Sequence, residues 1–195
     1  MNKLVVHPTS VSQWLELVRE ASAHLKLSFD ENVESYLVFL LMRFATNPEI
    51  AKKIIATDFL ESHHKVGKAQ AQLRKEVGDN CLMFSGLFPG RARARRVRIS
   101  YYINIGKSAY QSLIDDKNDK YNDLFAQLSD KFIGLTEVMH AMREVNNYEA
   151  SLDLLEALEL WSDTGSLKAK EQLLTTIKSS SGIITNDNLV SKNKH

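Results

Sequence analysis

Two segments of the chain are apolar on nearly every side of a helix, and they limit the folds open to it. The run SYLVFLLMRF spans residues 35–44, and the run CLMFSGLF spans residues 81–88. A helix on a protein surface buries one stripe only, so a helix that is apolar all round has to lie inside the fold. Covering two such helices requires several others. The sequence therefore predicts a core with two largely buried central helices.

The rest of the chain is typical of amphipathic helices joined by short loops. Capping-box patterns at Ser10 and Ser28 predict where the first two helices begin. Apolar side chains at three- and four-residue spacing predict further helices. These are helices from Pro48, Lys68 and Ser100, one long helix over residues 121–144, and two helices on either side of Gly165-Ser166. On the helix before Gly165 the side chains expected to face inward are Leu152, Leu155, Leu158 and Leu160. With only 8 Gly and 3 Pro and no long alternating run, the sequence predicts an all-α fold, a single globular bundle of about seven or eight helices.

Length and composition predict one domain in a cytoplasmic protein. A chain of 195 residues suffices for one sizeable core. We expect residues 1–178 to form the helical domain and the Ser-, Asn- and Lys-rich residues 179–195 to form a flexible C-terminal tail. The net charge of +1 gives no global attraction to nucleic acid or membrane. The N-terminal residues lack the apolar length of a signal peptide, and the single Cys81 excludes an internal disulfide.

Two Glu-x-x-His patterns, Glu61 with His64 and Glu137 with His140, resemble the ligand pairs of di-iron helical bundles. Such ligands must point into the core. Helical phase places Glu137 about half a turn away from the apolar stripe of its helix and His140 at the side of that stripe. Glu61 and His64 also lie off their stripe. The patterns therefore predict no metal and no cofactor.

Other chemical candidates are also better explained as ordinary structure. His63 and His64 are adjacent and point apart on a helix, and no nearby acid or Cys completes a zinc site. Glu20 and His24 fit a solvent-facing pair. Cys81 lies on a buried stripe, where a thiol packs as a small apolar group. The chain has no nucleophile elbow, P-loop or Rossmann pattern, so the sequence favours a protein without catalytic activity.

Five arginines within residues 91–98, which we name the arginine linker, are the strongest electrostatic feature: Arg91, Arg93, Arg95, Arg96 and Arg98. A guanidinium fork suits carboxylate and phosphate, so an acidic protein or a phosphate-bearing ligand is an expected partner. Nucleic acid fits less well because no aromatics alternate with the arginines. The alternative is internal pairing with nearby acids: Glu149, Asp153, Glu156, Glu159 and Asp163, or Asp115 and Asp116.

A second group of polar residues has two interpretations: Arg43, Asp79, Tyr101, Tyr102, Gly106, Ser108 and Tyr110. In the first, Arg43 and Asp79 form a buried ion pair between the two apolar helices, with a tyrosine hydroxyl beside it, because each charge alone is costly there. In the second, the group lines a pocket of a small-molecule-binding protein or an unrecognised enzyme.

Several motifs around these residues resemble a family of proteobacterial helical proteins that has no assigned function. They are Gly78-Asp79 before an apolar helix, the GLFP break at residues 86–89, the basic linker, and the segment SYYINIGKSAY at residues 100–110. The resemblance implies an all-helical fold organised around residues 78–110. It brings no reaction, ligand or partner with it.

The function that we expect from the sequence is that of a non-enzymatic helical module. The arginine linker would engage an acidic or phosphate-bearing partner. Gly106 and Ala109 are small enough for the close approach of a neighbouring helix. The exposed side of the helix that carries Gly106 is a candidate for a further helix–helix contact, including self-association, so a homo-oligomer is one expected outcome.

Overall fold

The computed structural model describes residues 11–46, 66–114, 121–147 and 152–190, and every regular element in these ranges is an α-helix. The all-α prediction is confirmed. The helices are α1 (Val11–His24), α2 (Glu31–Thr46), α4 (Gly67–Leu87), α5 (Pro89–Ala94), α6 (Ile99–Gln111), α7 (Asn122–Asp130), α8 (Phe132–Asn147), α9 (Leu154–Thr164) and α10 (Leu167–Val190).

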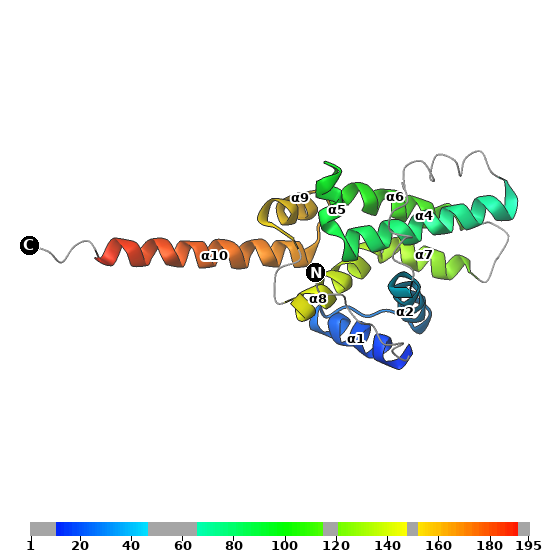
Figure 1. Ribbon diagram of the computed structural model, residues 1–195, viewed down its shortest axis with the longest axis horizontal. Helices are drawn as coiled ribbons and strands as arrows, with labels where there is room; N and C mark the ends of the chain where they lie inside the picture. Colours follow the sequence, from blue (N-terminus) through cyan, green and yellow to red (C-terminus); the bar gives the residue numbers. More distant parts are fainter. Residues whose placement is uncertain (1–10, 47–65, 115–120, 148–151, 191–195) are drawn as a thin grey trace, which may run out of the picture.

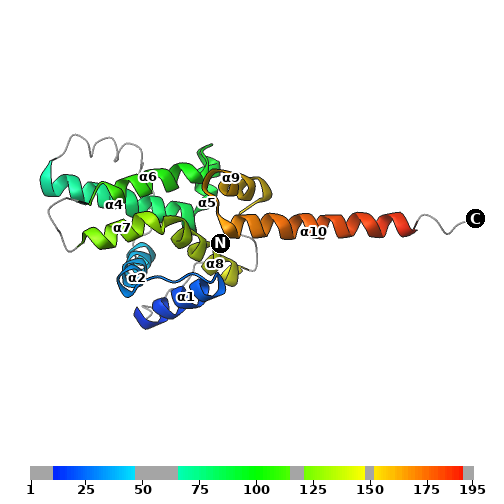
Figure 2. The same cartoon turned by 180° about the vertical axis from the view of Figure 1, so that it is seen from behind.

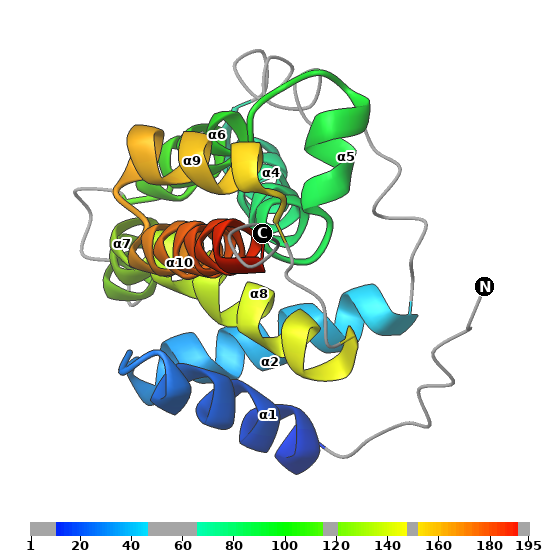
Figure 3. The same cartoon turned by 90° about the vertical axis from the view of Figure 1, so that its left-hand side faces the viewer.

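The helices lie around α4, which packs against α6 along one side and against α8 on another. Viewed along α10, α6 and α9 lie above the level of α7, α8 and α10, and α1 and α2 lie below it (Figure 3). Figure 2 shows the same order from behind. The apolar second half of α4 explains its place, because every residue over positions 77–86 is buried. In α2 the apolar run is buried apart from residues such as Phe39, which is 59% exposed.

Small residues let α6 and α8 approach α4 closely. A Cβ at Gly106 of α6 would overlap the ring of Phe132 on α8 and lie 2.8 Å from the Cβ of Cys81 on α4. Gly106 and Ala109 are both buried. The close approach that we expected at Gly106 and Ala109 is therefore made inside the molecule.

The predicted single helix over residues 121–144 is two helices. Lys131 lies between α7 and α8 with φ −88° and ψ 10°, and its amide donates to the carbonyl of Gln127 at 2.8 Å. The break redirects the chain, so that α7 covers α6 and α2 while α8 covers α4 and α1. Leu128 and Phe132, on either side of it, are both fully buried. The apolar stripe with a period of 3.6 residues correctly predicted helical structure on both sides of Lys131. It does not reveal that the helix axis changes direction there.

The start of α2 also differs from the prediction. Asp30, rather than Ser28, caps this helix, because its carboxylate accepts a hydrogen bond from the amide of Val33 at 2.8 Å. This bond lowers the pKa of Asp30. An aspartate is as good a cap as a serine, so the capping-box pattern at Ser28 misplaced the start by two residues.

The last two helices form a hairpin, which we name the C-terminal hairpin. A capping box of Asp153 and Glu156 begins α9, and Gly165 ends it in the left-handed conformation with φ 74°. The predicted stop at Gly165 is confirmed. Helix α10 continues past the predicted boundary at residue 178 to Val190 and projects from the rest of the molecule (Figure 1).

Several predictions fall on residues outside the described ranges. They are the helix after Pro48, the pair Glu61 and His64 with His63, the acids Asp115 and Asp116 in the predicted loop, and Glu149. Among the helices that the structure describes, none is both long and apolar enough to cross a membrane.

Candidate functional site

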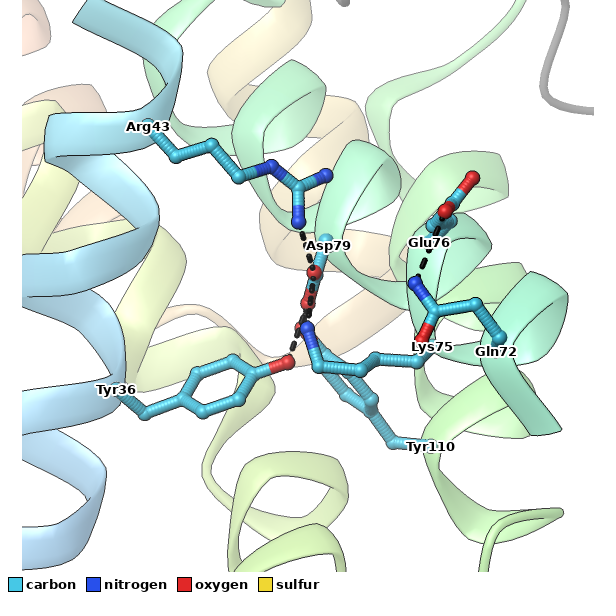
Figure 4. A network of polar contacts seen from close by, with 7 residues as sticks. All are labelled: Tyr36, Arg43, Gln72, Lys75, Glu76, Asp79 and Tyr110. Carbon is cyan, nitrogen blue, oxygen red and sulfur yellow. Dashed lines mark hydrogen bonds and ion pairs between the residues drawn. The ribbon is translucent and has the colours of Figure 1, made fainter. Parts of the chain in front are cut away.

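A buried carboxylate joins three helices at the centre of the molecule (Figure 4). Asp79 is completely buried. Its Oδ1 accepts hydrogen bonds from the hydroxyls of Tyr36 at 2.5 Å and Tyr110 at 2.9 Å. Its Oδ2 lies 2.8 Å from Nζ of Lys75 and 3.4 Å from Nη1 of Arg43. We call these five residues the Asp79 cluster. The expected contact between Arg43 and Asp79 is present, with two tyrosine hydroxyls beside it.

The Asp79 cluster depends on a glycine one residue earlier. A Cβ at Gly78 would lie 2.5 Å from Cε1 of Tyr110. The absence of a side chain there lets the Tyr110 ring of α6 lie flat against α4, where its hydroxyl reaches Asp79. Phe125 of α7 stacks on the other side of the ring at 6.0 Å. The dipeptide Gly78-Asp79 thus supplies both the space and the acceptor for one tyrosine.

Electrostatics keep both tyrosines in the hydrogen-bond donor form. Burial raises the pKa of Tyr36 and of Tyr110, and the charge of Asp79 raises both further. The two cations are only partly buried, since Arg43 exposes 38% of its side chain and Lys75 exposes 30%. All four donors converge on one carboxylate, so each of its oxygens already accepts two contacts. This arrangement is typical of a structural core cluster.

The other residues of the predicted pocket do not converge on Asp79. Tyr102 is buried with its ring 5.7 Å from Phe84, and Tyr101 is 42% exposed. Ser108 lies on the exposed side of α6. Sequence reasoning missed Tyr36 and Lys75. Both leave a signal, because Lys75 lies four residues before Asp79 and Tyr36 lies seven before Arg43, spacings that place each pair on one helix face.

The arginine linker packs beside α9, and two of its arginines pair with that helix. Arg93 makes a bidentate contact with Glu156, at 2.9 Å and 2.7 Å, and lies 2.9 Å from Asp153. Arg98 contacts Asp163 at 3.1 Å and Glu159 at 3.4 Å. The acids are four of those that the sequence suggested as internal partners. For Arg93 and Arg98, internal pairing is the observed arrangement.

The same contacts shift the pKa values of the groups involved. The hydrogen bond and charge of Glu156 raise the pKa of Arg93. A 2.7 Å hydrogen bond from Ser100 lowers the pKa of Asp163, and Arg98 lowers it further. Both guanidinium groups are more than half exposed, so each pair contributes modestly to stability. Their main effect is to fix α9 against the linker.

Two linker arginines are placed differently. Arg95 is exposed and lies over the Phe84 ring at 5.8 Å, and Arg96 is exposed in the left-handed conformation with φ 55°. Within the described residues neither pairs with a carboxylate. Arg96 lines a groove of about 370 Å³ between the linker and α9, together with Arg93, Arg98 and Leu155. Arg91 belongs to α5.

The positions of Glu137 and His140 contradict the prediction from helical phase. Glu137 and His140 were expected off the buried stripe, yet they are 6% and 1% exposed. The neighbours of α8 explain this, because Ser166 and the first turn of α10 contact Glu137, and Ser85 of α4 contacts His140. Glu137 accepts a 2.6 Å bond from Ser166 and a bond from the amide of Lys168, which anchors the first turn of α10. His140 bonds the carbonyl of Ser85 at 2.8 Å, and burial lowers its pKa to about 4.

The remaining candidates have structural surroundings. Cys81 is buried, and burial raises the pKa of its thiol, which leaves it a poor nucleophile. Glu20 and His24 are exposed on α1. Within the residues that the structure describes, no group of three or more His, Cys, Asp or Glu side chains is arranged to hold a metal ion.

Comparison of the chain with protein-family models, with curated proteins and with solved structures finds no match.

Proposed function

We propose that this chain is a non-enzymatic helical interaction module that binds an acidic or phosphate-bearing partner through the arginine linker. Among the linker arginines whose side chains the structure describes, Arg95 and Arg96 remain for a partner, because Arg93 and Arg98 are paired with α9. Arginine presents a planar fork to two oxygens of a carboxylate or phosphate group. The proposed function therefore rests on two exposed arginines, of which Arg96 lines the groove and Arg95 lies over the Phe84 ring.

The observation that carries the proposal is the backbone at Arg96. The amide of Val97 bonds the carbonyl of Ala92 at 3.0 Å, and the amide of Arg96 bonds that of Arg93 at 2.9 Å. This is the Schellman pattern that ends a helix, and its left-handed residue is usually glycine. A left-handed non-glycine residue costs roughly 1–2 kcal/mol. Lys26 has the same conformation at the end of α1, but Arg96 also lines the groove beside α9 and has no carboxylate partner among the described residues. The two observations at Arg96 together support a role of its side chain in binding.

The groove beside Arg96 fits a short acidic segment better than a bare anion. Its lining alternates charge, since Glu156 and Glu159 lie beside the arginines, and Leu155 is 64% exposed at its edge. A free phosphate would leave the exposed Leu155 side chain uncovered. A peptide can place a carboxylate or phosphate on Arg96 and an apolar side chain on Leu155.

The test measures binding of the full chain to two fluorescent peptides, one rich in glutamate and one phosphorylated, by anisotropy at low and moderate salt. Arg96→Gly removes the side chain and relieves the backbone cost. We expect it to weaken binding about tenfold or more while raising the free energy of unfolding by about 0.5–1 kcal/mol, the left-handed cost less the entropy cost of glycine.

Lys26 provides a matched control. It is exposed with φ 56° at the end of α1, where the amide of Leu27 bonds Ser22 and its own amide bonds Ala23. Lys26→Gly should stabilise the protein by a similar amount and leave peptide binding unchanged. Equal affinities for the original chain and for Arg96→Gly would refute the proposed function, as would an equal loss in the Lys26→Gly variant.

A further inference from the structure

The C-terminal hairpin carries an exposed apolar groove on the side of α9 away from the arginine linker. Its walls are Leu154, Leu158 and Trp161 of α9 and Leu173, Leu174 and Ile177 of α10, and it encloses about 230 Å³. Lys170 borders it, with Nζ 5.7 Å from the Trp161 ring. The sequence predicted Leu155 and Leu158 to face inward, but they are 64% and 47% exposed, and Ala157 and Leu160 occupy the buried face of α9.

The groove has the area of the largest apolar patch on a typical monomer surface. Leu154, Leu158, Trp161, Leu174 and Ile177 are each 39–55% exposed. Together they leave on the order of 450 Å² of apolar surface, and a patch of this size is often functional. A standard interface buries about 800 Å² per partner. Leu167, which is 74% exposed, and the stems of flanking charged residues extend the surface toward that value.

We infer that this groove is a dimerisation surface, in which α10 of a second copy of this chain packs antiparallel on α10 and closes a four-helix bundle with both hairpins. Leu167, Leu174 and Ile177 follow the seven- and three-residue spacing of a helix–helix seam. In an antiparallel pair with Leu174 of one copy opposite Ile177 of the other, the layers repeat symmetrically about a two-fold axis, the commonest symmetry of oligomers.

Charge complementarity selects the second copy and the direction of packing. Glu171 and Lys178 are exposed and seven residues apart, so they lie on one flank of the seam. In the antiparallel register above, Glu171 of each copy lies opposite Lys178 of the other, which makes the ion pair twice. A parallel register would instead place the two copies of Lys170 against each other within the seam. The surface is thus complementary to itself in one direction.

The projection of α10 supports the same occupant. Ile177 lies in the groove beside Leu154, the first residue of α9, so the residues after Ile177 extend beyond α9. Figures 1 and 2 show this part of α10 standing away from the rest of the molecule. Helices in proteins owe most of their stability to packing against neighbours. An antiparallel copy of α10 supplies that neighbour along the projecting part.

The experiment is sedimentation velocity on the full chain over a concentration series, followed by charge reversal at the flank. A mass approaching twice 22.1 kDa with rising concentration is expected. Glu171→Lys places like charges opposite each other at both contacts, and so does Lys178→Glu. Each variant should weaken the dimer about tenfold. The reason is that two exposed ion pairs, each worth a few tenths of a kcal/mol, become repulsive contacts of similar size.

Mixing the two variants separates dimerisation through this flank from any change in folding. One variant then carries only positive and the other only negative charge at the two positions, so a 1:1 mixture should form heterodimers, and the double variant should regain the original dimer. Glu20→Lys, on the exposed face of α1, is the matched control and should leave the dimer unchanged. A monomer at every concentration, or single variants that dimerise as before, would overturn the inference and leave the groove to a helix of another protein.

Discussion

Replacing Asp79 with alanine should be among the most destabilising single changes in this chain. The change removes the acceptor of two buried hydroxyls, those of Tyr36 and Tyr110. A hydrogen bond to a charged group is worth about 1.5–3 kcal/mol, and a buried donor left unsatisfied costs about 1–3 kcal/mol. Lys75 and Arg43 are partly exposed and can turn to water, so their loss adds little. The expected cost is about 3–5 kcal/mol.

Urea denaturation followed by circular dichroism measures this cost. With a slope of about 2 kcal/mol per molar urea, the midpoint should fall by about 1.5–2.5 M without a change in slope. Tyr110→Phe leaves Asp79 with three other contacts and should cost only about 1 kcal/mol. Asp130→Ala, an exposed carboxylate on α7, should lie within 0.5 kcal/mol of the original chain.

The order of the stability losses in these variants tests whether the Asp79 carboxylate joins the helices. If Asp79→Ala costs less than Tyr110→Phe, the tyrosine hydroxyl has another acceptor and the carboxylate does not join the helices. A loss below about 1 kcal/mol for Asp79→Ala would show that the buried charge is already a burden that the contacts only just offset.

Two further predictions concern α8 and the helix contacts. Burial lowers the pKa of His140 to about 4. Below pH 6.5 the unfolded chain therefore binds a proton that the folded chain excludes. The free energy of unfolding should fall by about 3 kcal/mol as the pH drops from 6.5 toward 4. Urea midpoints across this range should show a smaller fall in His140→Gln. Gly106→Ala should cost about 2 kcal/mol or more because its Cβ would overlap the ring of Phe132, whereas Gly90→Ala in α5, with open space around it, should be neutral or stabilising by up to about 1 kcal/mol in the same titration.

Helical periodicity was enough to predict the fold class and the central position of α4. The second half of that helix is apolar on every side, which leaves it no surface position. The break at Lys131 was not predictable in this way. A stripe of apolar residues continues across the break, and only the neighbours on either side require the axis to turn there. The start of α2 was misplaced because Ser28 and Asp30 are both good caps.

The Asp79 cluster was half predictable. Two charges on the most apolar helices of a chain must find each other or reach water, which pointed to Arg43 and Asp79. The tyrosines have a less specific signal, since any of several could turn a hydroxyl inward. The glycine at position 78 decides in favour of Tyr110, because its missing side chain makes room for that ring. A contact of this kind depends on three-dimensional proximity that spacing alone does not encode.

Helical phase predicted the buried face wrongly in both α8 and α9. In α8 it placed a buried glutamate outside, in α9 it placed exposed leucines inside, and both errors have one cause. A stripe identifies the buried face of a helix only when one neighbour covers it. Helix α8 is covered by α4 and also by the start of α10, so Glu137 is buried although it lies off the stripe. Helix α9 has leucines on two faces. The ion pairs of the linker with Glu156 and Asp163 orient the helix so that the face with Leu154 and Leu158 is exposed to solvent. The arginines therefore determine which leucines form the groove. Breaking the Arg93 contact should loosen α9 and weaken self-association together, whereas Arg96→Gly should weaken the capture of an acidic partner and leave self-association unchanged.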